Sequence, residues 1–244
     1  MSAEFIAASQ NNTLPEGPLL KKTSPVKEPF FSLANAQLAY EGRVVLNDIS
    51  LSIAPGERVA LVGKSGVGKS TLLAALREQQ SNSVAWCPQQ HGLVPILSVY
   101  HNIYMGGLQR HNTLYNLINL IKPLAKPLWD VAALAELLQL SESLHARVEQ
   151  LSGGQAQRVA IGRALYQQQA IFFGDEPVSA VDDYQAHQLL TLILEKHETL
   201  VLALHDVEQA LRFCDRIIGL KEGAIVLDAP SSTLKPSDLV ELYR

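Results

Sequence analysis

Cysteine, basic charge and long apolar runs are all scarce in this sequence, and each scarcity removes a class of protein. The only two cysteines, Cys87 and Cys214, lie far apart without metal-ligand spacing, which excludes a disulfide framework and a cysteine-based zinc site. Twenty basic side chains against 24 acidic ones give a net charge of -4, which argues against nucleic acid as the main partner. The longest apolar stretches, 189–194 and 200–204, are too short to span a membrane.

The chain divides into two predicted units. Residues 1–29 carry Ser, Asn, Thr, Pro and Lys without periodicity, and 1–12 lacks the basic start and apolar core of a signal peptide. We predict a flexible N-terminal tail over 1–29, because such a stretch buries too little apolar surface to become ordered. A partner-binding role for this tail is the alternative. Residues 30–244 are long enough to form one domain with its own core.

The most informative stretch is a glycine-rich segment that follows the apolar run 58–62. It fits the pattern G-x-x-x-x-G-K-[ST], in which backbone N–H groups close around phosphate oxygens. Lys69 is then expected to reach the outer phosphates and Ser70 to bind Mg²⁺. A chance glycine-rich turn is disfavoured, because the segment joins a strand pattern to a helix pattern. The predicted phosphate-binding residues are Gly63, Lys64, Ser65, Gly66, Val67, Gly68, Lys69, Ser70 and Thr71.

Other elements flank this loop in a definite order. Apolar alternation over 30–53 predicts a small antiparallel sheet, in which Tyr40 by itself is an ordinary edge-strand aromatic. A short strand, 84–87, precedes Gln89, and helical stripes with proline and glycine breaks follow over 99–148. A second glycine-rich turn at 151–155 again leads into a helix, which implies a second anion-facing site.

Polar side chains follow two further apolar strands. Asp175 and Glu176 come directly after the strand 170–174 and suit one Mg²⁺ ligand and one water-activating base, with a solvated acidic turn as the alternative. His205 follows the strand 200–204, at the sheet edge where parallel folds bind ligands. The other six histidines, His197 among them, are expected in unremarkable surface positions. A hairpin over 216–228 and a helix over 238–244 complete the pattern.

With Leu151–Gln155 added to the phosphate loop, residues 31–244 resemble the nucleotide-binding subunits of ATP-binding cassette (ABC) transporters. The resemblance implies an α/β fold: a P-loop NTPase core with a parallel sheet, a small antiparallel β subdomain and a helical subdomain at about 94–165. Gln89 follows Ser70 by only 19 positions, fewer than is usual in the family, so a shortened β subdomain is expected. Gly174 stands where the family usually has an apolar residue, and we expect it to loosen its strand.

The resemblance also implies a role for each site residue. Glu176 is expected to be the catalytic base, assisted by Gln89 and by His205 as the switch histidine. Ser70, Gln89 and Asp175 are expected to hold Mg²⁺. The remaining nucleotide-binding residues implied by the resemblance are Tyr40, which would stack on adenine, and Ser152, Gly153, Gly154, Gln155 and Asp182, which would act in a dimer.

The cofactors implied are ATP and Mg²⁺. The partners implied are a second ATPase subunit in a head-to-tail dimer, a membrane permease contacted through the helical insert, and a solute-binding protein indirectly, with no nucleic acid. Such a subunit would lie peripherally on the cytoplasmic side of the inner membrane. Its dimer would close on two ATP molecules and reopen after hydrolysis.

Short segments extend the resemblance to phosphonate-type importer ATPases, namely 89–99, 107–110 with 113–114, and 239–243. A small oxyanion such as a phosphonate is therefore the predicted cargo, by analogy only. Two alternatives stay open from the sequence. One is a non-transport ABC ATPase of DNA repair, although such proteins carry a coiled coil, zinc-binding cysteines or a second cassette. The other is a small-molecule kinase that uses the same phosphate loop.

Overall fold

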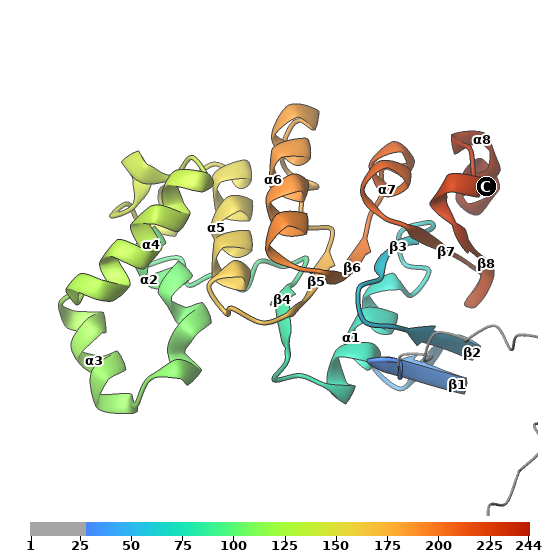
Figure 1. The fold of residues 1–244 in the computed structure, drawn as a ribbon, viewed down its shortest axis with the longest axis horizontal. Coiled ribbons are helices and arrows are strands. Elements are labelled where there is room, and N and C mark those ends of the chain that lie inside the picture. The colour runs from blue at the N-terminus through green and yellow to red at the C-terminus, as the bar shows by residue number, and fades with distance from the viewer. Residues whose placement is uncertain (1–27) are drawn as a thin grey trace, which may run out of the picture.

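The computed structural model describes residues 28–244 (Figure 1). The predicted tail, 1–29, therefore lies almost entirely outside the described residues, and its flexibility stays a prediction. Within the described part, a central six-stranded sheet carries helices on both faces, and a two-stranded sheet lies beside it. The α/β class predicted from the sequence is confirmed.

The central sheet is parallel except at one edge. Five neighbouring strands run parallel, and the sixth pairs antiparallel with the fifth, as the predicted hairpin requires. Continuous apolar strands are typical of a sheet covered on both faces. The strands in spatial order are β4 (Val84–Cys87), β5 (Ile171–Asp175), β6 (Thr199–Ala203), β3 (Arg58–Val62), β7 (Arg216–Lys221) and β8 (Ala224–Pro230).

The two faces of this sheet build two cores. Alternate residues of a strand point to opposite faces, so Val59 packs in one core and Ala60 in the other. Helix α1 (Lys69–Gln79) covers the face that the small sheet shares. The other face is covered by α5 (Gly153–Leu165), α6 (Asp183–Lys196) and α7 (Val207–Phe213) (Figure 1).

The small sheet contains β1 (Phe31–Tyr40) and β2 (Arg43–Ile53), which pair antiparallel. The expectation of a shortened β subdomain is confirmed, because the short stretch before Gln89 holds only α1, a turn and β4. Several contacts anchor the sheet, among them one to α1 and one to β5. The Gln79 side chain on α1 exchanges hydrogen bonds of 3.1 and 3.0 Å with the Ser32 backbone, and the buried Phe31 ring lies 5.0 Å from that of Phe173.

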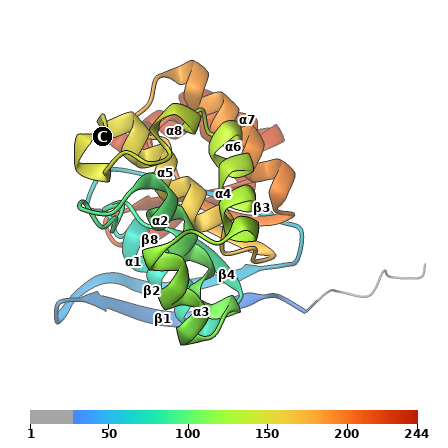
Figure 2. The same cartoon turned by 90° about the vertical axis from the view of Figure 1, so that its left-hand side faces the viewer.

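Between β4 and α5 the chain forms a helical group at one end of the molecule (Figures 1 and 2). It contains α2 (Val99–Tyr104), α3 (Thr113–Ile121) and α4 (Ala125–Leu137), with 3₁₀ turns at Met105–Arg110, Ser141–Ser143 and Val148–Gln150. Buried polar side chains hold the group together. Asn102 bonds the backbone of Val94 at 2.8 and 3.1 Å, and the Tyr100 hydroxyl donates to Asn119 at 2.8 Å.

The chain after β8 differs from the predicted helix over 238–244. A 3₁₀ turn at Ser231–Thr233 leads to α8 (Pro236–Leu239), and a second 3₁₀ turn, Val240–Tyr243, follows. The helix begins earlier because a proline at its first position fits a helix start. Leu239 and Leu242 are buried in the core, which holds this short segment against the sheet.

Candidate active site

A cavity of about 690 Å³ lies between the phosphate loop, the end of β1 and the end of β5. This volume is typical of a site for a small molecule. Most of the residues predicted for nucleotide chemistry within one chain line it. They are Tyr40, Ser65, Gly66, Gly68, Lys69, Ser70, Thr71, Gln89 and Glu176.

The phosphate loop needs its glycines for conformation and for space. Gly63 and Gly68 have φ angles of 141° and 111°, in the region where side chains are strained. A Cβ at Gly68 would lie 2.8 Å from the Leu46 side chain, and one at Gly63 would collide with the Leu220 carbonyl oxygen. Gly68 also provides no side-chain cap for α1, so the first N–H groups of that helix are left for another acceptor.

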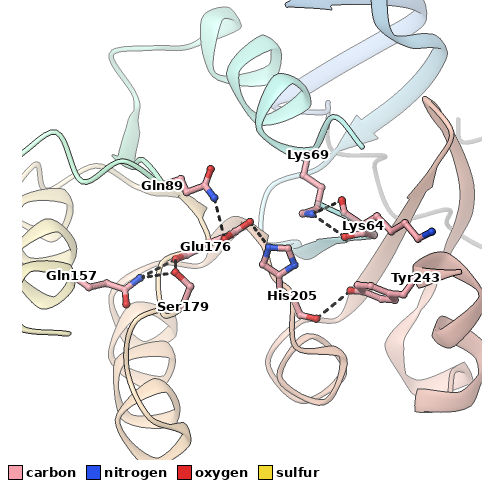
Figure 3. Close-up of polar contacts among 9 residues, drawn as sticks. Lys64, Lys69, Gln89, Gln157, Glu176, Ser179, His205 and Tyr243 are labelled. Carbon is pink, nitrogen blue, oxygen red and sulfur yellow. Dashed lines mark hydrogen bonds and ion pairs between the residues drawn. The ribbon is translucent and has the colours of Figure 1, made fainter. Parts of the chain in front are cut away.

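Lys69 is buried and bonded to its own loop. Its Nζ atom donates to the carbonyl oxygens of Gly63 at 2.8 Å and Lys64 at 3.0 Å (Figure 3). Burial lowers the pKa of Lys69, and the charges of Glu176 and Asp175 oppose that shift. The ammonium group therefore interacts with the charges of two carboxylates and donates hydrogen bonds to the loop.

Asp175 ends β5 with one side-chain oxygen that lacks a partner among the described residues. Its residue is 4% exposed, and its Oδ1 atom is buried without a hydrogen-bond partner in the described chain. Burial raises the pKa of Asp175, while a hydrogen bond with the Ser70 hydroxyl opposes the shift. A buried orphan oxygen calls for a ligand, and a carboxylate beside a hydroxyl is the oxygen donor set that Mg²⁺ prefers. These residues fit a Mg²⁺ ion.

Glu176 holds the other candidate residues together. Its Oε1 atom lies 2.5 Å from Nε2 of His205, and its Oε2 atom accepts from Nε2 of Gln89 at 3.2 Å (Figure 3). The three residues come from the ends of β4, β5 and β6, which are neighbours in the sheet. Glu176 has a φ of 53°, a conformation that non-glycine residues hold only when their surroundings fix it. A carboxylate so held can orient a water molecule.

The predicted signature lies elsewhere in the chain. Ser152 caps α5 by accepting from the Gln155 N–H, and the Gln155 side chain accepts from the Ser152 N–H, which is a capping box. Gly153 is exposed at the start of this helix, and no signature residue lines the cavity. Asp182 caps α6 by accepting from the Gln185 N–H at 2.9 Å. Within one chain, these predicted residues are not brought to the cavity.

Comparison with known proteins is consistent with this geometry. The family model described as ABC transporter matches residues 46–83 and 76–179. The chain belongs to the ABC transporter family. Accordingly, it is an ATP-binding subunit with the ATPase activity of that family.

Two relatives and two solved structures resemble this ABC ATPase over most of its length. The Phosphonates import ATP-binding protein PhnC of Maricaulis maris is 34% identical, over 86% of this chain and 91% of that protein. The Phosphite import ATP-binding protein PxtA of Stutzerimonas stutzeri is 34% identical, over 90% and 89%. A dimeric ABC transporter cassette has a TM-score of 0.70 at 25% identity, over 82% and 98%. A second structure of that same cassette, bound to ADP and Pi, has the same fold, with a TM-score of 0.71 at 24% identity over 82% and 98%.

Two predictions about individual residues of the ABC ATPase were wrong. Gly174 does not loosen β5, because an added Cβ would lie 2.9 Å from Pro177 and 3.0 Å from Leu202; the neighbours already fill the space. His197 is not at the surface. Its ring packs against that of Phe172 at 5.1 Å, and burial lowers its pKa.

No helix within residues 28–244 combines the length and apolar content needed to cross a bilayer.

Sequence reasoning missed two residues that support the site of this ABC ATPase. Gln157 on α5 donates to the Glu176 carbonyl oxygen at 2.9 Å, and the Tyr243 hydroxyl donates to the His205 carbonyl oxygen at 3.2 Å (Figure 3). Gln157 could have been found as a polar residue on the apolar face of the predicted helix. Nothing in the sequence near Tyr243 indicates its partner.

Proposed function

We propose that Glu176 activates the water molecule that attacks ATP bound in the cavity. The observation that carries this proposal is the fixed carboxylate, which Gln89 and His205 hold beside the cavity that also contains Lys69. A positioned general base typically raises the rate by about 10²–10⁴-fold. His205 would sense the γ-phosphate through the same contact.

Mg²⁺ would be held by Asp175 and Ser70, with Gln89 as a third oxygen ligand once it leaves Glu176. The unpartnered Oδ1 of Asp175 supports this assignment. A bound Mg²⁺ ion would supply positive charge to the phosphate oxygens. Lys69 would leave its loop carbonyls to bind the outer phosphates. Tyr40, which is 62% exposed and lines the same cavity, would stack on adenine.

Ser152, Gly153, Gly154 and Gln155 would complete the site of a second copy of the chain. The exposed N-terminus of the 13-residue helix α5 supports this role, since a helix N-terminus attracts a phosphate group. Asp182 would lie at the same subunit interface. Two ATP molecules would thus join a head-to-tail dimer, and hydrolysis would release it.

A membrane permease is the partner that we propose for the helical group. Large apolar side chains are exposed there, among them Leu114, Leu117 and Ile121 on α3 and Trp129 on α4, and such patches mark interaction sites. A cytoplasmic helix of the permease would sit between Gln89 and this group. The subunit would then be peripheral to the cytoplasmic side of the inner membrane, and a solute-binding protein would act through the permease.

For the cargo we propose a small phosphorus oxyanion such as a phosphonate or phosphite. The relatives named for phosphonates import and phosphite import support this choice. Both are import proteins, which also disfavours a DNA-repair ATPase or a kinase. The test is binding by the cognate solute-binding protein, and failure to bind phosphonate, phosphite or phosphate would exclude the oxyanion and leave the ATPase assignment intact.

The experiment for the ATPase mechanism is Glu176→Gln. This variant is expected to bind ATP, to trap the closed dimer and to lose about 10²–10⁴-fold in turnover. The exposed Glu198 provides a matched control, because Glu198→Gln makes the same chemical change away from the cavity. Turnover by Glu176→Gln close to that of the control would contradict the assignment.

A further inference from the structure

One buried side chain joins α5, the helix proposed to face the partner's nucleotide, to the loop that carries Glu176. Gln157 lies one turn inside α5 and is 1% exposed. Its Nε2 atom donates to the Glu176 carbonyl oxygen at 2.9 Å (Figure 3). Its Oε1 atom accepts from the Ala180 N–H at 2.6 Å. Both ends of the amide are therefore used on one short loop, 176–180.

This loop holds Glu176 in its unusual backbone conformation. Besides Gln157, the Ser179 hydroxyl at 3.1 Å and the Ser179 N–H at 3.3 Å donate to the Glu176 carbonyl oxygen. A residue with a φ of 53° keeps that conformation only while such contacts persist. Because the backbone angle sets the direction of the side chain, losing the contact from Gln157 would let the carboxylate move relative to Gln89 and His205.

Helix α5 has little room to move independently of this loop. A Cβ added at Gly154 would lie 3.1 Å from the Ala180 carbonyl oxygen and 3.3 Å from the Val181 side chain, so the first turn already packs directly on the loop. Because close-packed atoms have no free space between them, a displacement of α5 would also displace the loop 176–180. Gln157 adds a directional link between the same two elements.

We propose that Gln157 is a positioning residue through which α5, when Ser152 binds the partner's ATP, sets the carboxylate of Glu176 in its own subunit. The inference rests on the proposed function, which assigns Glu176 as the base and Ser152 as a contact to the other site. Each nucleotide would then align the base that attacks the other nucleotide. The two ATP molecules of a dimer would be hydrolysed in a coupled manner as a result.

The first test is Gln157→Leu in the full chain, with ATP affinity and turnover measured separately. ATP affinity is expected to stay within about twofold of wild type, because Gln157 does not line the cavity, whereas turnover should fall about tenfold or more through misplacement of the base. Gln167→Leu is the matched control. Gln167 also pairs its side-chain amide with a backbone, at 3.2 and 3.4 Å to Trp86, but does not touch Glu176.

The decisive test is a double-mutant cycle with Ser152→Ala. If Gln157 transmits the state of Ser152, then Gln157→Leu should lower turnover by less than about threefold in the Ser152→Ala background. Gln167→Leu should have the same effect in both backgrounds. Full additivity of Gln157→Leu with Ser152→Ala, or wild-type turnover of Gln157→Leu, would overturn the proposal. Should the leucine variant not fold, Gln157→Met, which is unbranched and of similar length, takes its place in the cycle.

Backbone amide hydrogen exchange tests the proposal without any substitution at Gln157. With ATP present, Ser152→Ala alone is expected to speed backbone amide exchange across 176–180, and unchanged exchange there would overturn the proposal. Failure of the proposed function can be told apart from failure of this inference. A Glu176→Gln enzyme that keeps its turnover would show that Glu176 is not the base. If Glu176→Gln is inactive but the effects of Gln157→Leu and Ser152→Ala on turnover are additive, only the role proposed for Gln157 is refuted.

Discussion

Replacing Tyr40 tests whether the cavity binds the base of a nucleotide as well as its phosphates. The side chain is 62% exposed and lines the cavity, so its loss should change the folding stability by no more than about 0.5 kcal/mol. An aromatic platform contributes about 1–3 kcal/mol per stacked base. Since 1.4 kcal/mol is a factor of ten, Tyr40→Ala should weaken ATP binding about 5- to 150-fold.

Fluorescence titration with a labelled ATP analogue measures this change directly. Tyr40→Trp keeps a flat aromatic face and should bind as tightly as wild type. Tyr184 provides the control, because it is a tyrosine of similar exposure, 72%, on α6 and outside the cavity. If Tyr40→Ala and Tyr184→Ala bind ATP equally well, the stacking argument is refuted and Tyr40 is an ordinary edge-strand aromatic.

The remaining predictions test other parts of the site. A mixture of Gly153→Asp and Lys69→Ala subunits should regain ATPase activity that neither has alone, because one composite site stays intact. That activity should stay about tenfold or more below wild type, because the base of the intact site is no longer aligned through the second site; no gain at all would contradict action in trans. Gly174→Ala should lower the thermal unfolding midpoint, because the added Cβ would make three contacts of 2.9–3.0 Å. Such overpacking costs about 1–3 kcal/mol, and an unchanged midpoint would show that β5 shifts to accommodate the methyl group. Asp175→Asn should raise the midpoint of the nucleotide-free protein by removing a buried charge with an unpartnered oxygen, and should abolish Mg²⁺-dependent turnover. Ile96→Cys, 66% exposed beside the helical group, should crosslink to a co-expressed permease, and no crosslink would argue against that docking site.

The crosslinking design depends on the two native cysteines. Both are buried, and burial raises the pKa of each thiol to about 12. The thiolate is the reactive form, so these residues should not compete with a cysteine introduced at the surface. The cysteine-free background that such an experiment usually needs is unnecessary here.

The elements that carry the site could be predicted because their signals are local. The runs 59–62, 170–174 and 200–204 are apolar throughout, as strands covered on both faces must be, and each leads directly into predicted site residues. Parallel strands present their carboxyl ends at one edge, and β4, β5 and β6 accordingly bring Gln89, Glu176 and His205 together.

The supporting contacts could not be predicted because they join distant parts of the chain. Gln157 lies 19 and 23 residues from its partners Glu176 and Ala180, and Tyr243 lies 38 residues from His205. Burial of His197 against Phe172 likewise arises only when α6 packs on the sheet. The packing around Gly174 depends on a neighbouring strand in the same way.

The separate two-stranded sheet bears on which nucleoside triphosphates the enzyme accepts. Tyr40 ends β1, whereas the phosphate loop and the carboxylates belong to the six-stranded sheet. A stacking ring binds the face of a base and leaves its edges unread, and stacking is tolerant because every base has such a face. Discrimination between adenine and guanine would therefore be weak. The relative abundance of ATP and GTP in the cell would then determine which of them the enzyme hydrolyses.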